Sequence, residues 1–179
     1  PLLGEHQLHN AATVLEAVSV LREQGWDIDD EAVESGLYSV AWPARFEVLH
    51  TDDPWFVLDG GHNPQCAAAL RECLEHYFPD SKRVALVGVL KDKDYKSIAA
   101  TLAPLFDACV CVTPPSERAL PAEELAELFK DSCREVCVAG TVEDGVDIAR
   151  DIAQEQDAMV CAFGSLYICG QIRSCFGLR

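Results

Sequence analysis

The chain changes character within residues 55–64, which read Trp-Phe-Val-Leu-Asp-Gly-Gly-His-Asn-Pro. The apolar start predicts a strand over residues 55–59, and the periodic apolar positions that follow predict a helix over residues 64–77. Pro64 suits the first helical position and Asn63 suits the cap before it. In an open α/β sheet such a turn lies at the carboxyl end of a strand, where ligands usually bind.

Strand and helix patterns alternate from here to the end of the chain. Strands are predicted over residues 45–50, 55–59, 83–89, 107–112, 135–138 and 158–162. Helices are predicted over residues 64–77, 95–104, 121–130, 143–153 and 165–174. The alternation predicts an α/β, Rossmann-like fold with a mostly parallel six-stranded sheet flanked by helices. The first two strands form a hairpin in this prediction, which supplies one antiparallel edge strand.

The first 41 residues follow a different pattern. Apolar residues recur at helical spacing over residues 7–23, and Asp29 and Asp30 cap a second, short helix. We therefore expect residues 1–41 to be a helical segment that ends a preceding domain, and residues 42–179 to form the Rossmann-like domain. The start at Pro1, without a methionine, indicates a fragment.

The composition limits the kinds of partner. A net charge of −16 argues against a nucleic-acid surface, which needs a basic footprint. The sequence has no apolar run near 18 residues and no signal peptide, so no membrane partner is expected. We expect a cytoplasmic monomer, in which a few cations and helix N-termini could still bind a small anionic ligand.

Nine cysteines raise the question of a metal site or disulfides. Their number is odd, no Cys-x-x-Cys occurs, and most lie within apolar strand or helix patterns, as Cys109 and Cys111 do. A thiol-dependent redox protein would need paired cysteines. The pattern therefore favours reduced cysteines that fill the core, no metal site and a cytoplasmic location.

Three residues near the first turn are candidates for ligand binding. The carboxylate of Asp59 could accept ribose hydroxyls, hold a metal or only cap the turn. His62 lies on the loop, where it could face a cleft or solvent. Arg45 follows a proline turn and could bind phosphate oxygens or pair with Glu47.

Two other turns follow predicted strands and carry polar side chains. After strand 83–89, Lys91 could meet an anionic substrate, whereas Lys93 and Asp94 could merely cap the next helix. After the last strand, Ser165 stands at a helix N-terminus, where it could help to bind an anion or serve as an ordinary N-cap. Neither Gly-x-x-x-x-Gly-Lys-Ser/Thr nor Gly-x-Gly-x-x-Gly occurs, so the chain lacks a main phosphate cradle.

Three motifs together resemble the Mur ligase family. They are residues 4–12, Gly-Glu-His-Gln-Leu-His-Asn-Ala-Ala; residues 43–47, Pro-Ala-Arg-Phe-Glu; and residues 59–64, Asp-Gly-Gly-His-Asn-Pro. The combination is most similar to the folate branch of the family, the folylpolyglutamate and dihydrofolate synthases, and it covers essentially the whole chain. The resemblance implies a C-terminal ligase domain preceded by the last helices of an ATPase domain, which would act in cis.

The family's reaction implies substrates and cofactors. ATP, with Mg²⁺ held mostly by the absent ATPase domain, would phosphorylate a carboxylate of dihydropteroate or a folate. The amine of L-glutamate would then attack the acyl phosphate to form an amide. By matched position, Arg45 would contact the nucleotide phosphates, Asp59 the ribose, and Asn10 the adenine.

The remaining matched residues concern glutamate. His62 would lie beside the incoming glutamate and the reacting groups as the catalytic residue, and Lys91 and Ser165 would bind the glutamate carboxylates. Without the ATPase domain, the fragment should be inactive. A cell-wall muropeptide ligase and a non-catalytic module that binds nucleotide or glutamate stay open as alternatives.

Overall fold

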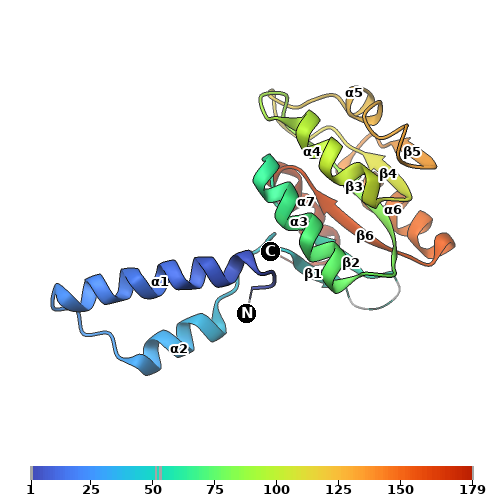
Figure 1. Ribbon diagram of the computed structural model, residues 1–179. Coiled ribbons are helices and arrows are strands. Elements are labelled where there is room, and N and C mark those ends of the chain that lie inside the picture. The colour runs from blue at the N-terminus through green and yellow to red at the C-terminus, as the bar shows by residue number, and fades with distance from the viewer. Residues whose placement is uncertain (1, 51, 53, 179) are drawn as a thin grey trace. The chain divides into compact units, whose positions relative to one another are not determined.

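The computed structural model describes every residue except 1, 51, 53 and 179 (Figure 1). It divides into two compact units, Pro1–Pro43 and Ala44–Arg179. No helix in the described part is long and apolar enough to cross a bilayer.

The first unit consists of two helices, α1 (His6–Glu23) and α2 (Asp30–Ser39). The side chain of Asp29 caps α2 by accepting a hydrogen bond from Ala32 N, and Arg22 pairs with Asp30. Neither helix buries a residue. Large apolar side chains are therefore exposed along this unit: Leu8, Val14, Leu15, Val20, Trp26 and Tyr38.

The second unit is built on one six-stranded sheet. Its strands are β1 (Glu47–His50), β2 (Phe56–Leu58), β3 (Lys82–Val87), β4 (Ala108–Cys111), β5 (Glu135–Val138) and β6 (Ala158–Phe163). They are ordered β1-β2-β6-β3-β4-β5, and among these described strands only β1 pairs antiparallel with its neighbour. The predicted fold class is thus confirmed, including the antiparallel edge. As expected for central parallel strands, β6 is buried along its whole length.

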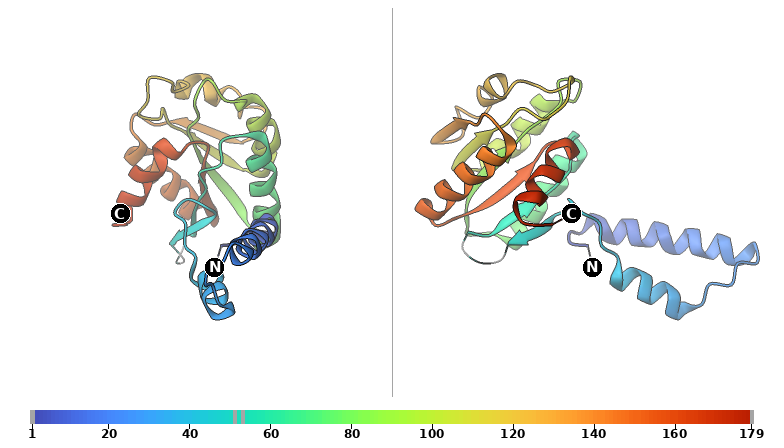
Figure 2. Two further views of the ribbon diagram at one scale, coloured as in Figure 1. Left: turned by 90° about the vertical axis from the view of Figure 1, so that its left-hand side faces the viewer. Right: turned by 180° about the vertical axis from the view of Figure 1, so that it is seen from behind.

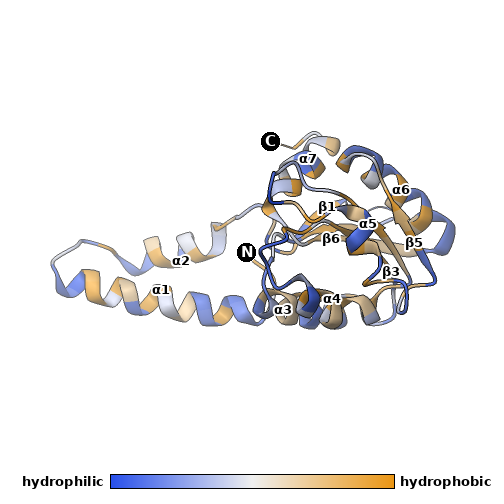
Figure 3. Cartoon of the chain, turned by 90° about the horizontal axis from the view of Figure 1, so that it is seen from above, coloured by the Kyte–Doolittle hydropathy of each residue, from blue (hydrophilic) through white to orange (hydrophobic). Residues whose placement is uncertain are grey.

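Helices cover both faces of the sheet. They are α3 (Pro64–Tyr77), α4 (Tyr95–Leu102) with the short 3-10 helix η1 (Ala103–Leu105), α5 (Ala122–Ala126), α6 (Val142–Gln156) and α7 (Leu166–Cys175). Seen from above, α3 and α4 lie on one side of the sheet and α6 and α7 on the other (Figure 3). The view from behind brings α6 and α7 to the front (Figure 2).

The predicted helix over residues 121–130 is shorter in the structure. α5 ends at Ala126, and turns with i to i−3 hydrogen bonds follow, from Leu128 N to Leu125 O and from Phe129 N to Ala126 O. These tighter turns carry the fully buried ring of Phe129 into the core. Burial of this aromatic ring overrides the local helical pattern.

Arg83 is a buried cation that holds helix ends to the sheet. Only 9% of the residue is exposed, and its guanidinium donates to Phe78 O at 2.6 Å, to Leu105 O at 3.3 Å and to Leu74 O at 3.4 Å. These carbonyls lie at or near the carboxyl ends of α3 and η1, and two of them also accept a backbone hydrogen bond, Leu74 O from Phe78 N and Phe78 O from Ser81 N. The guanidinium therefore adds a charged donor to these carbonyls and ties the ends of α3 and η1 to β3.

Replacing Arg83 by methionine should lower the free energy of unfolding by about 3 kcal/mol, because several buried carbonyls lose a charged donor. The matched control is Lys82→Met at the neighbouring exposed position, where we expect a loss within about 1 kcal/mol. Urea unfolding of the full-length protein measures both. Equal losses for the two variants would contradict the role given to Arg83.

Candidate active site

The candidate site lies where β2, β6 and β3 end. These strands are adjacent and parallel, so their carboxyl ends meet at one edge of the sheet. The turns that follow them carry His62, Lys93 and Ser165. The three predicted turns therefore come together, as strand order requires.

The turn after β2 is fixed by its own polar side chains. Asp59 accepts hydrogen bonds from Gly61 N at 2.7 Å and from Phe46 N at 2.9 Å, one on each carboxylate oxygen. Asn63 accepts a hydrogen bond from Cys66 N at 2.8 Å and caps α3, which begins at Pro64. The predicted caps at the start of this helix are confirmed.

The two glycines of this turn have no room for a side chain. A Cβ on Gly60 would lie 2.4 Å from Leu166 Cδ2, and a Cβ on Gly61 would lie 2.8 Å from Cys66 Cβ. Cys66 Cβ is fixed by the backbone of α3, so glycine is required at residue 61, whereas at residue 60 a Cβ would meet the movable end of the exposed Leu166 side chain of α7. This contact brings the start of α7 against the loop that carries His62.

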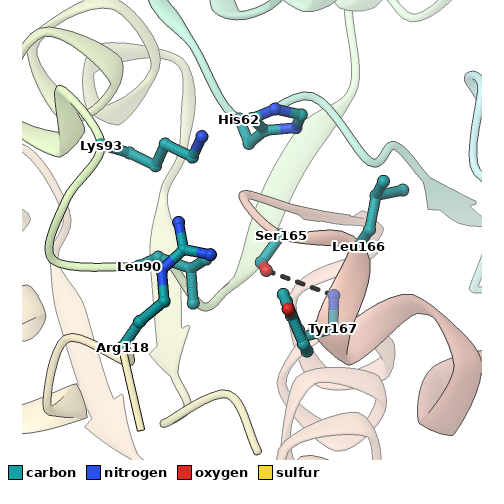
Figure 4. Close-up of a pocket in the computed structure, with 7 residues that line it drawn as sticks. All are labelled: His62, Leu90, Lys93, Arg118, Ser165, Leu166 and Tyr167. Carbon is teal, nitrogen blue, oxygen red and sulfur yellow. Dashed lines mark hydrogen bonds between the residues drawn. The ribbon is translucent and has the colours of Figure 1, made fainter. Parts of the chain in front are cut away.

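A cavity of about 180 Å³ opens beside these turns (Figure 4). His62, Lys93, Arg118 and Ser165 supply its polar groups. The apolar part of the lining comes from Leu90, Leu166 and Tyr167. Figure 4 shows Lys93 extending toward His62 from the opposite side of the cavity, and Arg118 reaching in from below. Two cations thus face one small cavity in a chain of net charge −16.

His62 is oriented by the backbone. Its Nδ1 lies 3.2 Å from the carbonyl oxygen of Gly60, which can only accept a hydrogen bond. A proton on Nδ1 satisfies this contact and leaves Nε2 of the neutral ring as an acceptor. The side chain is half-buried and lines the cavity, in agreement with a histidine that faces a cleft.

The loops after β3 and β4 are joined edge to edge. Leu90 and Ala119 form an antiparallel bridge, and Lys91 N donates to Arg118 O at 2.9 Å. At the tip, the Arg118 guanidinium pairs with Asp92, and its hydrogen bond lowers the pKa of that carboxyl. The pairing of the loops delivers Arg118 to the cavity although its own strand, β4, is not next to β2 or β6.

In the loop after β3, the lysine that lines the cavity is not the one that the sequence suggested. Lys91 is exposed and is not part of the cavity lining, whereas Lys93 lines it. Asp94 caps α4 alone, by accepting a hydrogen bond from Ser97 N at 3.2 Å. The loop therefore presents Lys93 to the cavity in the place where the sequence suggested Lys91.

Ser165 begins α7 as the sequence suggested. Its hydroxyl oxygen accepts a hydrogen bond from Tyr167 N at 3.2 Å, and only 2% of the residue is exposed. The hydroxyl proton is still available to a ligand in the cavity. Gly164 precedes it with φ of 109°, a conformation that favours glycine.

The remaining candidates lie outside the cavity lining. Arg45 is half-buried, and its Nη1 donates to Ala44 O at 3.3 Å. Glu47 pairs with Arg173 of α7, and among the described residues no ion pair joins Arg45 to Glu47. Asn10 is an exposed residue of α1 that donates to Gln7 Oε1 at 2.9 Å.

Sequence reasoning missed Arg118 and Tyr167. Arg118 follows β4 after a loop that contains two consecutive prolines, and nothing in its spacing shows that the loop folds back along the preceding one. A signal was present, because an arginine in the loop after a buried parallel strand is a candidate for the same sheet edge. Tyr167 is the second residue of α7, the helix that Ser165 caps.

Six of the nine cysteines are buried, whereas Cys66 and Cys137 are half-buried and Cys175 is exposed. Burial raises the pKa of Cys73 and of Cys133 to about 11, and that of Cys169 to about 12. Within the described residues, no three or more His, Cys, Asp or Glu side chains gather as a metal site would need. These protonated, buried thiols are typical of core packing rather than of thiol chemistry.

Solved structures of known proteins resemble the whole chain. The Mycobacterium tuberculosis folylpolyglutamate synthase complexed with ADP and AMPPCP has a TM-score of 0.88 and 34% identity, over 100% of this chain and 42% of that one. A bifunctional folylpolyglutamate synthase/dihydrofolate synthase from Yersinia pestis, complexed with AMPPNP and Mn ion, has a TM-score of 0.77 and 29% identity, over 90% of this chain and 38% of that one.

Sequence relatives point the same way. A probable bifunctional folylpolyglutamate synthase/dihydropteroate synthase from Halobacterium salinarum is 37% identical over 175 residues, which are 97% of this chain and 20% of that protein. The chain thus spans between a fifth and about two fifths of these relatives. The family described as Mur ligase, glutamate ligase domain, matches residues 44–166. The chain therefore belongs to the Mur ligase family, as its three motifs suggested.

Proposed function

We propose that the full-length protein is an ATP-dependent ligase that adds L-glutamate to dihydropteroate or a folate through an acyl phosphate. In this proposal the cavity of the second unit binds the incoming glutamate. The names of the relatives support the activity, and the cavity's two cations support the amino-acid substrate. The cysteines of the chain are free and mostly buried, which supports a location in a reducing compartment, the cytoplasm.

The observation that carries the proposal is the placement of Lys93 and Arg118 on one cavity with Ser165 and His62. L-glutamate has two carboxylates, and two cations would neutralise them. Arg118 uses one nitrogen for Asp92, which leaves further N–H donors for a forked contact with a carboxylate. Lys93 would act as a point charge, and Ser165 at the N-terminus of α7 would donate its hydroxyl proton.

His62 would then serve the chemical step. Its Nδ1 would keep its proton and donate it in a hydrogen bond to the Gly60 carbonyl, so Nε2 could accept a proton from the glutamate amine as this amine attacks the acyl carbon. The amine's lone pair forms the amide bond, and phosphate leaves with the electrons of the broken acyl–oxygen bond. No covalent protein nucleophile is required, because the protein's contribution is alignment and charge neutralisation.

The nucleotide would be bound in part by residues outside the cavity. Arg45 would contact its phosphates, and Asn10 would lie near the adenine. Asp59 would accept the ribose hydroxyls, since each of its oxygens keeps a lone pair beyond the backbone hydrogen bond that it already accepts. Mg²⁺ would neutralise phosphate charge when bound, with its ligands mostly in the ATPase domain.

The first unit would be the end of that ATPase domain. Its helices bury none of their own residues and expose several large apolar side chains, which a larger domain would cover. The domain would act in cis, and the full-length protein would be a monomer.

Comparing Lys93→Met with Lys91→Met in the full-length protein tests the proposal. The two lysines have the same charge and share one loop, but only Lys93 lines the cavity. We expect Lys93→Met to raise the KM for L-glutamate about tenfold through a lost charged contact, and Lys91→Met to leave it within about twofold. Steady-state kinetics with varied glutamate measure both, and a larger effect at Lys91 would contradict the assignment.

A further inference from the structure

The turn Ala44-Arg45-Phe46 has an unusual backbone. Ala44 has φ of 56° and Phe46 has φ of 46°, so two residues other than glycine adopt the left-handed region two positions apart. Both are buried, with 2% and 3% of their surface exposed. In this conformation the Cβ of an L-amino acid lies too close to the following carbonyl oxygen, so the conformation is strained. Such a turn persists only where surrounding contacts hold it.

Two carboxylates and one amide hold this turn. Glu47 Oε2 accepts a hydrogen bond from Ala44 N at 2.8 Å, and Asp59 Oδ2 accepts one from Phe46 N at 2.9 Å. Ala44 O in turn accepts a hydrogen bond from Gly60 N at 2.8 Å. The amides of both left-handed residues are thus bound by carboxylates that belong to β1 and to the turn after β2.

Arg45 stands between the two left-handed residues, so their backbone decides where its side chain goes. Its Nη1 lies 3.3 Å from Ala44 O and 3.3 Å from the position of a Cβ on Gly60. The guanidinium therefore lies along the glycine turn at the carboxyl end of β2. If Ala44 adopted the ordinary right-handed conformation, the backbone at Arg45 would change direction and the guanidinium would leave this position.

Glu47 is itself anchored on the far side. Its Oε1 accepts a hydrogen bond from the Arg173 guanidinium, and the two side chains are 23% and 14% exposed. Arg173 belongs to α7, the helix that Ser165 caps. The contact with Arg173 therefore holds the Glu47 carboxylate in the position from which it accepts the hydrogen bond of Ala44 N.

We infer that Glu47 is a positioning residue for nucleotide use: it holds Ala44 in the left-handed conformation that aims Arg45. This inference rests on the proposed contact between Arg45 and the nucleotide phosphates. Asp59 also holds the turn, through Phe46 N, but it is proposed to bind the ribose as well. A change at Asp59 would therefore combine a loss of turn support with a loss of ribose contacts. Glu47 separates them, because its two oxygens are used by Ala44 and Arg173.

The test is steady-state kinetics of full-length variants with ATP and L-glutamate varied separately. Glu47→Leu should raise the KM for ATP roughly tenfold, and leave the KM for glutamate within about twofold, because the left-handed turn loses one support. Glu47→Gln keeps an oxygen acceptor for Ala44 N and should raise the KM for ATP about threefold at most. A merely structural role would lower stability and disturb both KM values together.

Relief of the backbone strain gives a second readout. Glycine adopts positive φ freely, so Ala44→Gly added to Glu47→Leu should bring the KM for ATP back to within about threefold of wild type. The matched control is Asp157→Gly, because Asp157 also has positive φ but lies at the end of α6. Added to Glu47→Leu, it should restore nothing. If Glu47→Leu fails to fold, Glu47→Ala with and without Ala44→Gly carries the same comparison, because alanine also removes the acceptor for Ala44 N.

The failure of this inference differs from the failure of the proposed function. Arg45→Ala that leaves the KM for ATP unchanged would overturn the nucleotide role of Arg45 itself. If Arg45→Ala raises the KM for ATP but Glu47→Leu does not, the inference about Glu47 is overturned and the nucleotide role of Arg45 stands. Equal effects of Ala44→Gly and Asp157→Gly in the Glu47→Leu protein would also overturn it.

Discussion

Replacing Arg118 by methionine in the full-length protein is expected to raise the KM for L-glutamate about a hundredfold, because a forked, charged contact with a carboxylate is lost. The KM for ATP should stay within about twofold of wild type, since Arg118 lines the cavity proposed for glutamate. Initial rates with each substrate varied in turn measure the two values. A split between them locates the effect in amino-acid binding.

Two further variants sharpen the result for Arg118. Arg118→Lys keeps the charge but not the planar fork, so the KM for glutamate should fall between those of wild type and the methionine variant. Lys91→Met removes an exposed cation but keeps the backbone hydrogen bond from residue 91 N to Arg118 O, so it should change the KM for glutamate little. A hundredfold loss that appears equally in the KM for ATP would contradict a specific role in glutamate binding.

The second large effect is expected for Gly164→Ala, which should lower the free energy of unfolding by about 3 kcal/mol or more. Gly164 has φ of 109°, and a Cβ there would lie 2.7 Å from Gly88 O and 2.8 Å from Val89 Cγ1. The contacts involve backbone, which has little freedom to move. The substitution would therefore force apart the carboxyl ends of β3 and β6, on which Lys93 and Ser165 depend.

Gly170→Ala is the control for this change. Gly170 lies within α7, and a Cβ there would meet nothing within 4 Å. Alanine at that position should raise the free energy of unfolding by about 0.5–1 kcal/mol through helix propensity. Denaturant unfolding of both proteins measures the difference. A Gly164→Ala protein as stable as wild type would show that this turn is not held as the contacts indicate.

Much of the fold could be predicted because local patterns and long-range packing agree. The apolar runs of β3 and β6, and the capped turn at Asn63 and Pro64, are signals that the structure confirms.

The start of β1 was not predicted correctly. Strand structure was predicted from residue 45 but begins at Glu47, because residues 44–46 form the left-handed turn. Without glycine there, the sequence gives no sign of positive φ.

The candidate site was predictable in outline and not in its cations. His62 and Ser165 follow adjacent strands, so their meeting in one cavity follows from strand order. The choice of Lys93 over Lys91, and the presence of Arg118, depend on how two loops pair through Leu90 and Ala119. Such pairing is a long-range contact with no periodic pattern in either loop, so composition and spacing carry no information about it.

The central claim is tested most directly by ATP-dependent incorporation of labelled L-glutamate by the full-length gene product. Dihydropteroate and a tetrahydrofolate would be offered in separate reactions, with a muropeptide precursor as the comparison. We expect incorporation with at least one of the two pterin substrates and none with the precursor. A folded protein that binds ATP but adds glutamate to neither pterin substrate would contradict the proposed function.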